Sequence, residues 1–265
     1  MKIPVKLSAL LSARLIIFMA ALISCAALSA SPAPKDKDKE KEKEKEHEGQ
    51  NVDSGSFGVF MNGRRVGTET FSIHQSSNGS VIASEFKTEN AATEAAQTSE
   101  LQLTPSGEIR RYEWKEISPG KSHAVVTPSD QFLTEKWSAG PEDKDHEQPY
   151  LLPASTSILD DYFFIQREVL VWKFLAAACK QEKGQVQCPV KQRTQFGTLN
   201  PHQHSSAPLE AEYLGREKLS FKGSQQEFNK VELKTDAGPW LLWLDDQFKV
   251  VRMLIADNNT EVVRD

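Results

Sequence analysis

One long apolar stretch stands among many short strand-like runs: residues 155–184, STSILDDYFFIQREVLVWKFLAAACKQEKG. Ser157, with an acidic residue three positions later, is typical of a helix N-terminus, and two lysines before Gly184 are typical of a helix end. The apolar residues fall on all sides of such a helix, as in a helix enclosed by its own protein, and charged residues interrupt them too often for a membrane span. We expect one long apolar helix over about residues 156–179, with a break near Gln166–Glu168 as the alternative.

The rest of the chain after residue 55 has the pattern of an antiparallel meander. Asn62-Gly63 and Asn78-Gly79, each between strand-like runs, are strong hairpin signals. Further strand-like runs are separated by turn residues before the helix and return after it. Two polar stretches, residues 138–153 and 196–208, are expected to be loops, and the first has the length of a mobile flap or binding rim. We therefore predict an α+β domain that is mostly antiparallel sheet.

The last predicted hairpin, centred on Asp246-Gln247, is the most apolar β segment of the chain. Alternation along its first strand places Trp240 on one face and Trp243 on the other, so we expect cover on both faces. The helix would cover one face. The other could be covered by core, by a ligand or by a partner.

The first 30 residues have the pattern of a secretory signal peptide, with a positively charged start, a short apolar run and small residues. Cleavage before Ser31 is one interpretation. The other is a lipobox, residues 22–25, which would lead to cleavage before Cys25 and lipidation of that cysteine. Both place the protein outside the cytoplasm, in the periplasm or anchored as a lipoprotein in a bacterial envelope.

Residues 31–54 contain a run of alternating lysine and acidic residues that offers nothing apolar to bury. We interpret them as a disordered, charged spacer, with an arm that docks a partner as the alternative. The spacer would connect the envelope membrane to a single β-rich domain over residues 55–265. About 210 residues are enough for one well-packed core.

Two cysteines, Cys179 and Cys188, are left after the signal region. In an oxidising compartment such an even pair predicts a disulfide, which would hold the end of the helix to the next strand. Redox chemistry by two free thiols is the alternative, but the spacing is not that of a C-x-x-C motif.

The charge of the chain disfavours nucleic-acid binding, because the formal net charge is −5 and becomes more negative once the signal is removed. His202 and His204 could supply two metal ligands, but no third ligand lies close in sequence. The carboxylate pairs at 160–161 and 245–246 are explained by a helix start and a turn. We predict no catalytic residue, metal ligand or cofactor, although a hydrolase whose residues assemble in space is an open alternative.

One strand-like run, residues 108–117, combines basic and aromatic residues. Strand alternation would put Arg110, Tyr112 and Trp114 on one face, where they could contact lipid headgroups or glycans. A half-buried face is the simpler interpretation.

The runs NGRRVGTETFSI and LWLDDQFKVVRMLIADNNTEVVR, together with the helix after a long loop, resemble an uncharacterised family of bacterial exported proteins. The plan is similar to that of the lipoprotein-localisation proteins LolA and LolB. This resemblance implies a curved sheet or half-barrel with the helix against its concave face.

From these features we expect a non-enzymatic envelope protein that binds a lipid, another apolar ligand or a protein partner in a half-barrel. An assembly component tethered to the membrane, with a filled interior, is the second expectation. Five aromatic side chains of the helix and the last hairpin are the predicted ligand contacts: Tyr162, Phe164, Trp172, Trp240 and Trp243.

Overall fold

The computed structural model describes residues 49–89, 94–182, 185–236, 238–255 and 259–265. The expected signal peptide, Cys25 and residues 31–48 of the expected spacer lie outside these residues. The first strand, β1, begins at Gln50, before Gly55, the domain boundary expected from the sequence.

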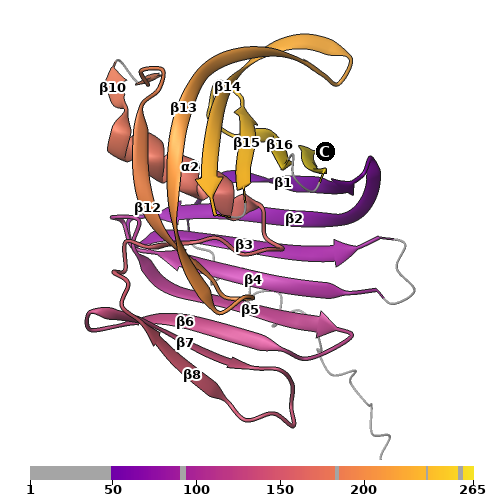
Figure 1. The fold of residues 1–265 in the computed structure, drawn as a ribbon, viewed down its shortest axis with the longest axis vertical. Helices are drawn as coiled ribbons and strands as arrows, with labels where there is room; N and C mark the ends of the chain where they lie inside the picture. The colour runs from indigo at the N-terminus through magenta and orange to yellow at the C-terminus, as the bar shows by residue number, and fades with distance from the viewer. Residues whose placement is uncertain (1–48, 90–93, 183–184, 237, 256–258) are drawn as a thin grey trace, which may run out of the picture. The chain divides into compact units, whose positions relative to one another are not determined.

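Most of the described chain forms one antiparallel sheet with a single helix (Figure 1). The strands of its first half are β1 (Gln50–Met61), β2 (Arg64–Ser76), β3 (Gly79–Thr88), β4 (Ala96–Leu103), β5 (Ile109–Ser118), β6 (His123–Ser129), β7 (Phe132–Ser138) and β8 (His146–Tyr150). Those of its second half are β9 (Ser157–Ile158), β12 (Arg193–Asn200), β13 (Ser205–Phe221), β14 (Ser224–Thr235), β15 (Gly238–Leu244), β16 (Val250–Ile255) and β17 (Thr260–Arg264). A small separate hairpin pairs β10 (Lys180–Glu182) with β11 (Gln185–Gln187).

The strand order is β8-β7-β6-β5-β4-β3-β2-β1-β17-β16-β15-β14-β13-β12-β9. All neighbours are antiparallel except β9 and β12, and β1 joins the two halves by pairing with both β2 and β17. The sheet is strongly curved (Figure 1), but β8 and β9 are its two ends and it does not close into a barrel. The prediction of a curved antiparallel meander is confirmed at this level.

The two asparagine-glycine hairpins are also confirmed. Asn62 (φ 52°) and Gly63 (φ 75°) connect β1 to β2 in the left-handed conformations that such tight turns require. Asn78 and Gly79 lie at the turn into β3.

The first expected loop contains a short strand, and the second is largely strand. Residues 138–153 include β8, which pairs with β7, and residues 196–208 include most of β12 and the start of β13. Both segments are polar because they face solvent along much of their length, and Tyr150 is the only fully buried residue of β8. The polar composition of these strands near the ends of the sheet is similar to that of loops, which is why the sequence predicted loops there.

The helix, α2 (Ile165–Ala178), is shorter than predicted and begins later. Ser157 is not its N-cap, because Ser157 and Ile158 pair with β12 as the short strand β9. The helix is continuous through Gln166–Glu168, as predicted, so the alternative of a break there does not occur. In the described part of the chain no helix has the length and apolar character needed to cross a membrane.

The helix ends at Ala178, before the lysines and Gly184 that were expected to end it. Cys179 follows immediately and forms the predicted disulfide with Cys188. The disulfide lies at the base of the β10–β11 hairpin and connects the end of α2 to the chain entering β12.

The helix lies inside the curve of the sheet, and its buried residues belong to the same core as β1–β7 and β12–β17. A second, smaller core covers the opposite face of β15 and β16, where Phe228, Trp243 and Val251 pack with residues of the long β13–β14 hairpin. The protein's own strands therefore provide the second cover that the last hairpin was expected to need.

Candidate ligand-binding site

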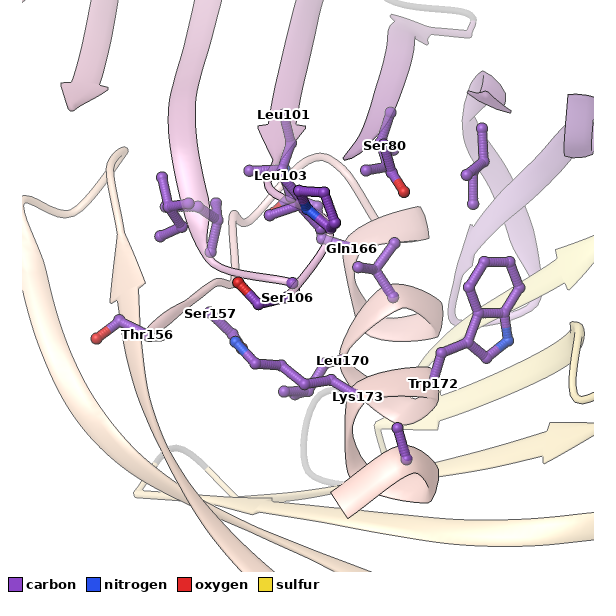
Figure 2. Close-up of a pocket in the computed structure, with 18 residues that line it drawn as sticks. Ser80, Leu101, Leu103, Ser106, Thr156, Ser157, Gln166, Leu170, Trp172 and Lys173 are labelled. Atoms are coloured by element: carbon purple, nitrogen blue, oxygen red, sulfur yellow. The ribbon is translucent and has the colours of Figure 1, made fainter. Parts of the chain in front are cut away.

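An apolar cavity of about 240 Å³ lies between α2 and the first half of the sheet (Figure 2). Strands β2 to β5 form one wall and α2 forms the other. The apolar lining residues are Ile73, Ile82, Leu101, Leu103, Ile109, Ile158, Val169 and Leu170. Pro105, Ser106 and Ala176 also line the cavity and are exposed, so it opens to solvent between the β4–β5 turn and the second half of the helix.

Polar groups line the cavity in several places, and Lys173 and Ser157 lie close together at one of them. Lys173 of α2 donates to the carbonyl oxygen of Ser155, and its Nζ lies 3.5 Å from Ser157 Oγ. Burial lowers the pKa of Lys173 below its ordinary value. Two further lining residues, Thr156 and Gln166, each have a buried polar atom without a hydrogen-bond partner among the described residues.

Trp172 is the end wall of the cavity. Its indole nitrogen donates to the carbonyl oxygen of Phe248 at 2.7 Å, which fixes the ring between α2 and the β15–β16 turn. A second hollow of about 400 Å³ lies at the same tryptophan and is also lined by Val52, Leu175 and Lys249. Trp172 therefore contributes to both spaces.

The position of α2 depends on a carboxylate from the sheet. Glu69 of β2 is fully buried, and its Oε2 accepts from the backbone N–H of Phe164 at 2.7 Å and of Ile165 at 3.3 Å. Ser84 Oγ donates to Oε1 at 2.6 Å. Burial raises the pKa of Glu69 to about 7 against the lowering effect of these hydrogen bonds. Glu69 thus satisfies the free N–H groups that a side-chain cap would otherwise satisfy.

Arg167, the first charged residue of α2, is also buried. Its guanidinium lies 4.0 Å from the ring centroid of Trp240 and 5.3 Å from that of Phe164, a cation–π arrangement. Nη1 donates to the carbonyl oxygen of Asp160 at 2.8 Å. Burial lowers the pKa of Arg167 to about 10, so it remains a cation at neutral pH.

Glu168 connects the helix to both ends of the domain sequence. Its Oε2 accepts from Val250 N at 2.6 Å and from Arg264 Nη2 at 2.8 Å. Arg264 also binds Asp53 of β1 through both guanidinium nitrogens, at 2.8 and 3.2 Å. Burial raises the pKa of Glu168 well above its ordinary value. Burial acts in the same direction on Asp53, but hydrogen bonds, that from Arg264 foremost, outweigh it and lower the pKa.

Two histidines of the β12–β13 turn each contact a buried carboxylate, Asp160 before α2 and Glu135 of β7. His202 Nδ1 lies 2.7 Å from Asp160 Oδ2, which also accepts from Tyr112 OH at 2.6 Å. Its ring stacks on Trp114 with centroids 3.9 Å apart, and Nε2 lies 2.8 Å from Gln97 Oε1. Burial, together with the charge of Asp160, raises the pKa of Tyr112 well above its ordinary value.

The second histidine repeats this arrangement. His204 Nδ1 lies 2.9 Å from Glu135 Oε1, Tyr150 OH donates to Oε2 at 2.9 Å, and the imidazole stacks on Trp137 at 4.2 Å. Burial raises the pKa of Glu135 against the lowering effect of His204. The turn is therefore held on β5 and β7 by two tyrosine–carboxylate–histidine groups, each backed by a tryptophan.

Neither histidine is arranged for a hydrolytic triad. In such a triad the second ring nitrogen faces a nucleophile, whereas His202 Nε2 faces the amide of Gln97. In the described ranges no hydroxyl or thiol is hydrogen-bonded to either ring, and no cluster of three or more His, Cys, Asp or Glu residues is suited to a metal ion.

The predicted carboxylate pairs have structural partners. Asp160 holds the network just described, and Asp161 accepts from Asn200 and Gln203 of the β12–β13 turn at 2.7 and 3.0 Å. Asp245 Oδ1 accepts from backbone N–H groups within its own turn, as a turn residue should.

The structure brings one of the five predicted ligand contacts, Trp172, to the cavity. Phe164 and Trp240 pack with Arg167, and Trp243 belongs to the second core. Tyr162 is 37% exposed and contacts Phe86 and the ring of His202.

The basic-aromatic surface considered for residues 108–117 does not form, and the simpler interpretation of a half-buried face is confirmed. Leu103 pairs with Ile109 and Gln102 with Arg111, so a bulge at Arg110 displaces it from the alternation. Arg110 is exposed and donates to the carbonyl oxygen of Asn78, while Tyr112 and Trp114 point into the core.

Sequence reasoning missed most of the cavity. Its wall is made of aliphatic residues of β2 to β5, which have the alternation of any half-buried strand and carry no further signal. Among the lining residues only Lys173 stands out in the sequence, because it is a single cation in the most apolar part of the helix.

No protein-family model and no curated protein matches this sequence. Among solved structures, the chain is similar to a DUF1089 family protein from Pseudomonas aeruginosa, with 9% identity and a TM-score of 0.40. The superposition covers 88% of this chain and 95% of that one. This likeness is too distant to carry an argument about function, and the resemblance to LolA and LolB has no support from these comparisons.

Proposed function

We propose that this protein is a non-enzymatic binding protein of the bacterial envelope that holds an apolar ligand, such as a lipid chain, beside α2. The cavity carries the proposal. Its volume of about 240 Å³ exceeds the roughly 150 Å³ of a cavity that binds benzene and is below the roughly 300–1,000 Å³ of pockets for drug-sized ligands. A slender, mostly aliphatic ligand fits these limits best.

The envelope location is inferred from the sequence, where a signal peptide or a lipobox at Cys25 is expected. The disulfide between Cys179 and Cys188 supports it, because such bonds persist in oxidising compartments. Lipidation of Cys25 would hold the binding domain near a membrane from which an apolar ligand could be drawn.

The cavity favours ligand binding over the two other functions considered. A purely structural component would gain stability by filling this space, since each unfilled methyl-sized void costs about 1 kcal/mol. A hydrolase needs a nucleophile next to its base, and Gln97 occupies that position at His202.

Filling the cavity tests the proposal. We expect the protein purified without detergent to release an apolar molecule on organic extraction, detected by mass spectrometry. The delipidated protein should bind octanol by isothermal titration calorimetry. Val169→Trp should abolish binding because Val169 lines the cavity, whereas Ala177→Trp, exposed on the same helix, should bind like the wild type.

Circular dichroism establishes that both variants are folded. Equal octanol binding by Val169→Trp and wild type would place the ligand elsewhere. A wild-type protein that binds no octanol and releases no apolar molecule would contradict the proposed function.

A further inference from the structure

Lys173 lines the cavity and reaches from α2 to Ser157. Figure 2 shows its side chain extending from α2 toward Ser157, so that the ammonium lies at the opposite side of the opening from its own helix. The aliphatic part of the lysine lines the cavity with its neighbours Val169 and Leu170. The residue thus combines an apolar stem within the cavity and a charge at its rim.

The ammonium group is incompletely paired. It donates to Ser155 O, and the contact to Ser157 Oγ is long at 3.5 Å. An ammonium group has three N–H donors, and only one of them forms a short hydrogen bond here. No carboxylate of the described residues forms an ion pair with Lys173, and the nearest acidic influence is the exposed Glu108 of the β4–β5 turn.

A half-buried cation of this kind is costly, because burial removes water and neutral oxygens replace it only in part. The burial that lowers the pKa of Lys173 reports the same cost. An anion placed at the rim would form a charge-assisted hydrogen bond with the free donors. The hydroxyl of Ser157, a lining residue 3.5 Å from the ammonium, could donate to the same anion, whereas the hydroxyl of Ser106 already donates to Glu108.

We infer that the ligand is an anionic amphiphile with one carboxylate headgroup, bound by the Lys173 ammonium, and an aliphatic tail in the cavity. This inference rests on the proposed function, since it assumes that the cavity holds a ligand, and it adds the headgroup chemistry. A cationic headgroup would meet the ammonium with like charge. A neutral one would leave it unpaired.

Three probes of equal chain length separate these cases: octanoate, octanol and octyltrimethylammonium, each titrated calorimetrically into the full-length delipidated protein. We expect octanoate to bind about tenfold or more tightly than octanol and the cation to bind weakest. In Lys173→Met the affinity for octanoate should fall about 10- to 100-fold, while octanol binding should change by less than about threefold. Methionine keeps the apolar stem. Lys180→Met, an exposed lysine of β10, is the matched control and should leave both affinities unchanged.

Two outcomes have different meanings. If octanol and octanoate bind equally and Lys173→Met weakens neither selectively, the cavity binds apolar ligands but the headgroup assignment is wrong. If none of the probes binds the wild type, the proposed function fails and the inference fails with it. Lys173→Arg should restore most of the octanoate affinity, which separates loss of charge from a general disturbance of the helix.

Discussion

The two flanks of α2 are buried in different ways. On one flank Arg167 and Glu168 are enclosed with Val171 and Phe174, and every one of these residues is nearly or fully inaccessible to solvent. On the other flank Val169, Leu170 and Trp172 face a cavity. Charged groups must find partners when buried, and those partners bring strands close and leave the flank filled. Aliphatic side chains need no hydrogen-bond partner, so the second flank of the helix can border a cavity.

The largest effect should come from breaking the charged flank at Arg264. Arg264→Met leaves the buried Glu168 without its cation and Asp53 with Lys249 alone, and we expect the free energy of unfolding to fall by about 3–5 kcal/mol. Urea denaturation measures this fall in the free energy of unfolding. Arg252→Met removes a partly exposed pair with Glu261 on the neighbouring strand and should cost at most about 1 kcal/mol. Equal losses in the two variants would contradict the role assigned to Arg264.

A pH dependence of similar size should come from Glu69. The folded protein holds this proton up to about pH 7, whereas the unfolded chain releases it near pH 4.5. The contribution of Glu69 to stability is therefore fully present below pH 4.5 and is lost as the pH rises to about 7. Relative to Glu69→Gln, the wild type should lose up to about 3 kcal/mol across this window.

Urea unfolding of both proteins at pH 4.5, 5.5, 7 and 8 gives this difference. Glu85→Gln, a partly exposed glutamate on β3, is the control and should follow the wild type. A stability difference between wild type and Glu69→Gln that does not change with pH would show that Glu69 keeps an ordinary pKa.

The histidine turn should give intermediate effects. His202→Phe keeps stacking on Trp114 but removes the contacts to Asp160 and Gln97, and we expect a loss of about 1–3 kcal/mol. His204→Phe should cost less, because the side chain of His204 is 31% exposed against 12% for His202. Thermal denaturation of both variants measures the order, and a larger loss at His204 would overturn it.

The smallest effect should be on the open flank and compares one substitution at two positions of the same helix. Val169→Leu adds a methylene toward the cavity and should change the unfolding free energy by less than about 1 kcal/mol. Val171→Leu adds it to a filled core and should cost about 1–3 kcal/mol. Urea denaturation distinguishes them, and equal costs would mean that the cavity is not available space.

Local signals predicted local features well. The turn at Asn62-Gly63, the run of antiparallel strands and the Cys179–Cys188 disulfide all depend on residues close in sequence, and all are present. The curvature of the sheet agreed with the expectation only in outline, because the structure is an open sheet with short ends.

The features that sequence reasoning missed depend on distant residues. Ser157 looked like an N-cap, but β12 pairs with it, and the cap function passes to Glu69, 95 positions before Phe164. Arg110 left the expected alternation because of a bulge. The cavity arises from the distance at which β2–β5 and α2 are held, which is set by such long-range contacts and not by the aliphatic residues that line it.

The two ends of the sheet also bear on how this protein behaves at high concentration. An open sheet presents unpaired N–H and C=O groups at its edges, which are templates for strand addition by another chain. Here one edge, β8, is a five-residue strand that contains Pro149, and the other, β9, consists of two residues. Short edges, one of them carrying a proline, discourage pairing between molecules. The β8 end of the sheet is therefore protected against strand addition, whereas β9 covers only Thr198 and Leu199 of β12 and leaves the rest of that strand's outer edge without a partner among the described strands.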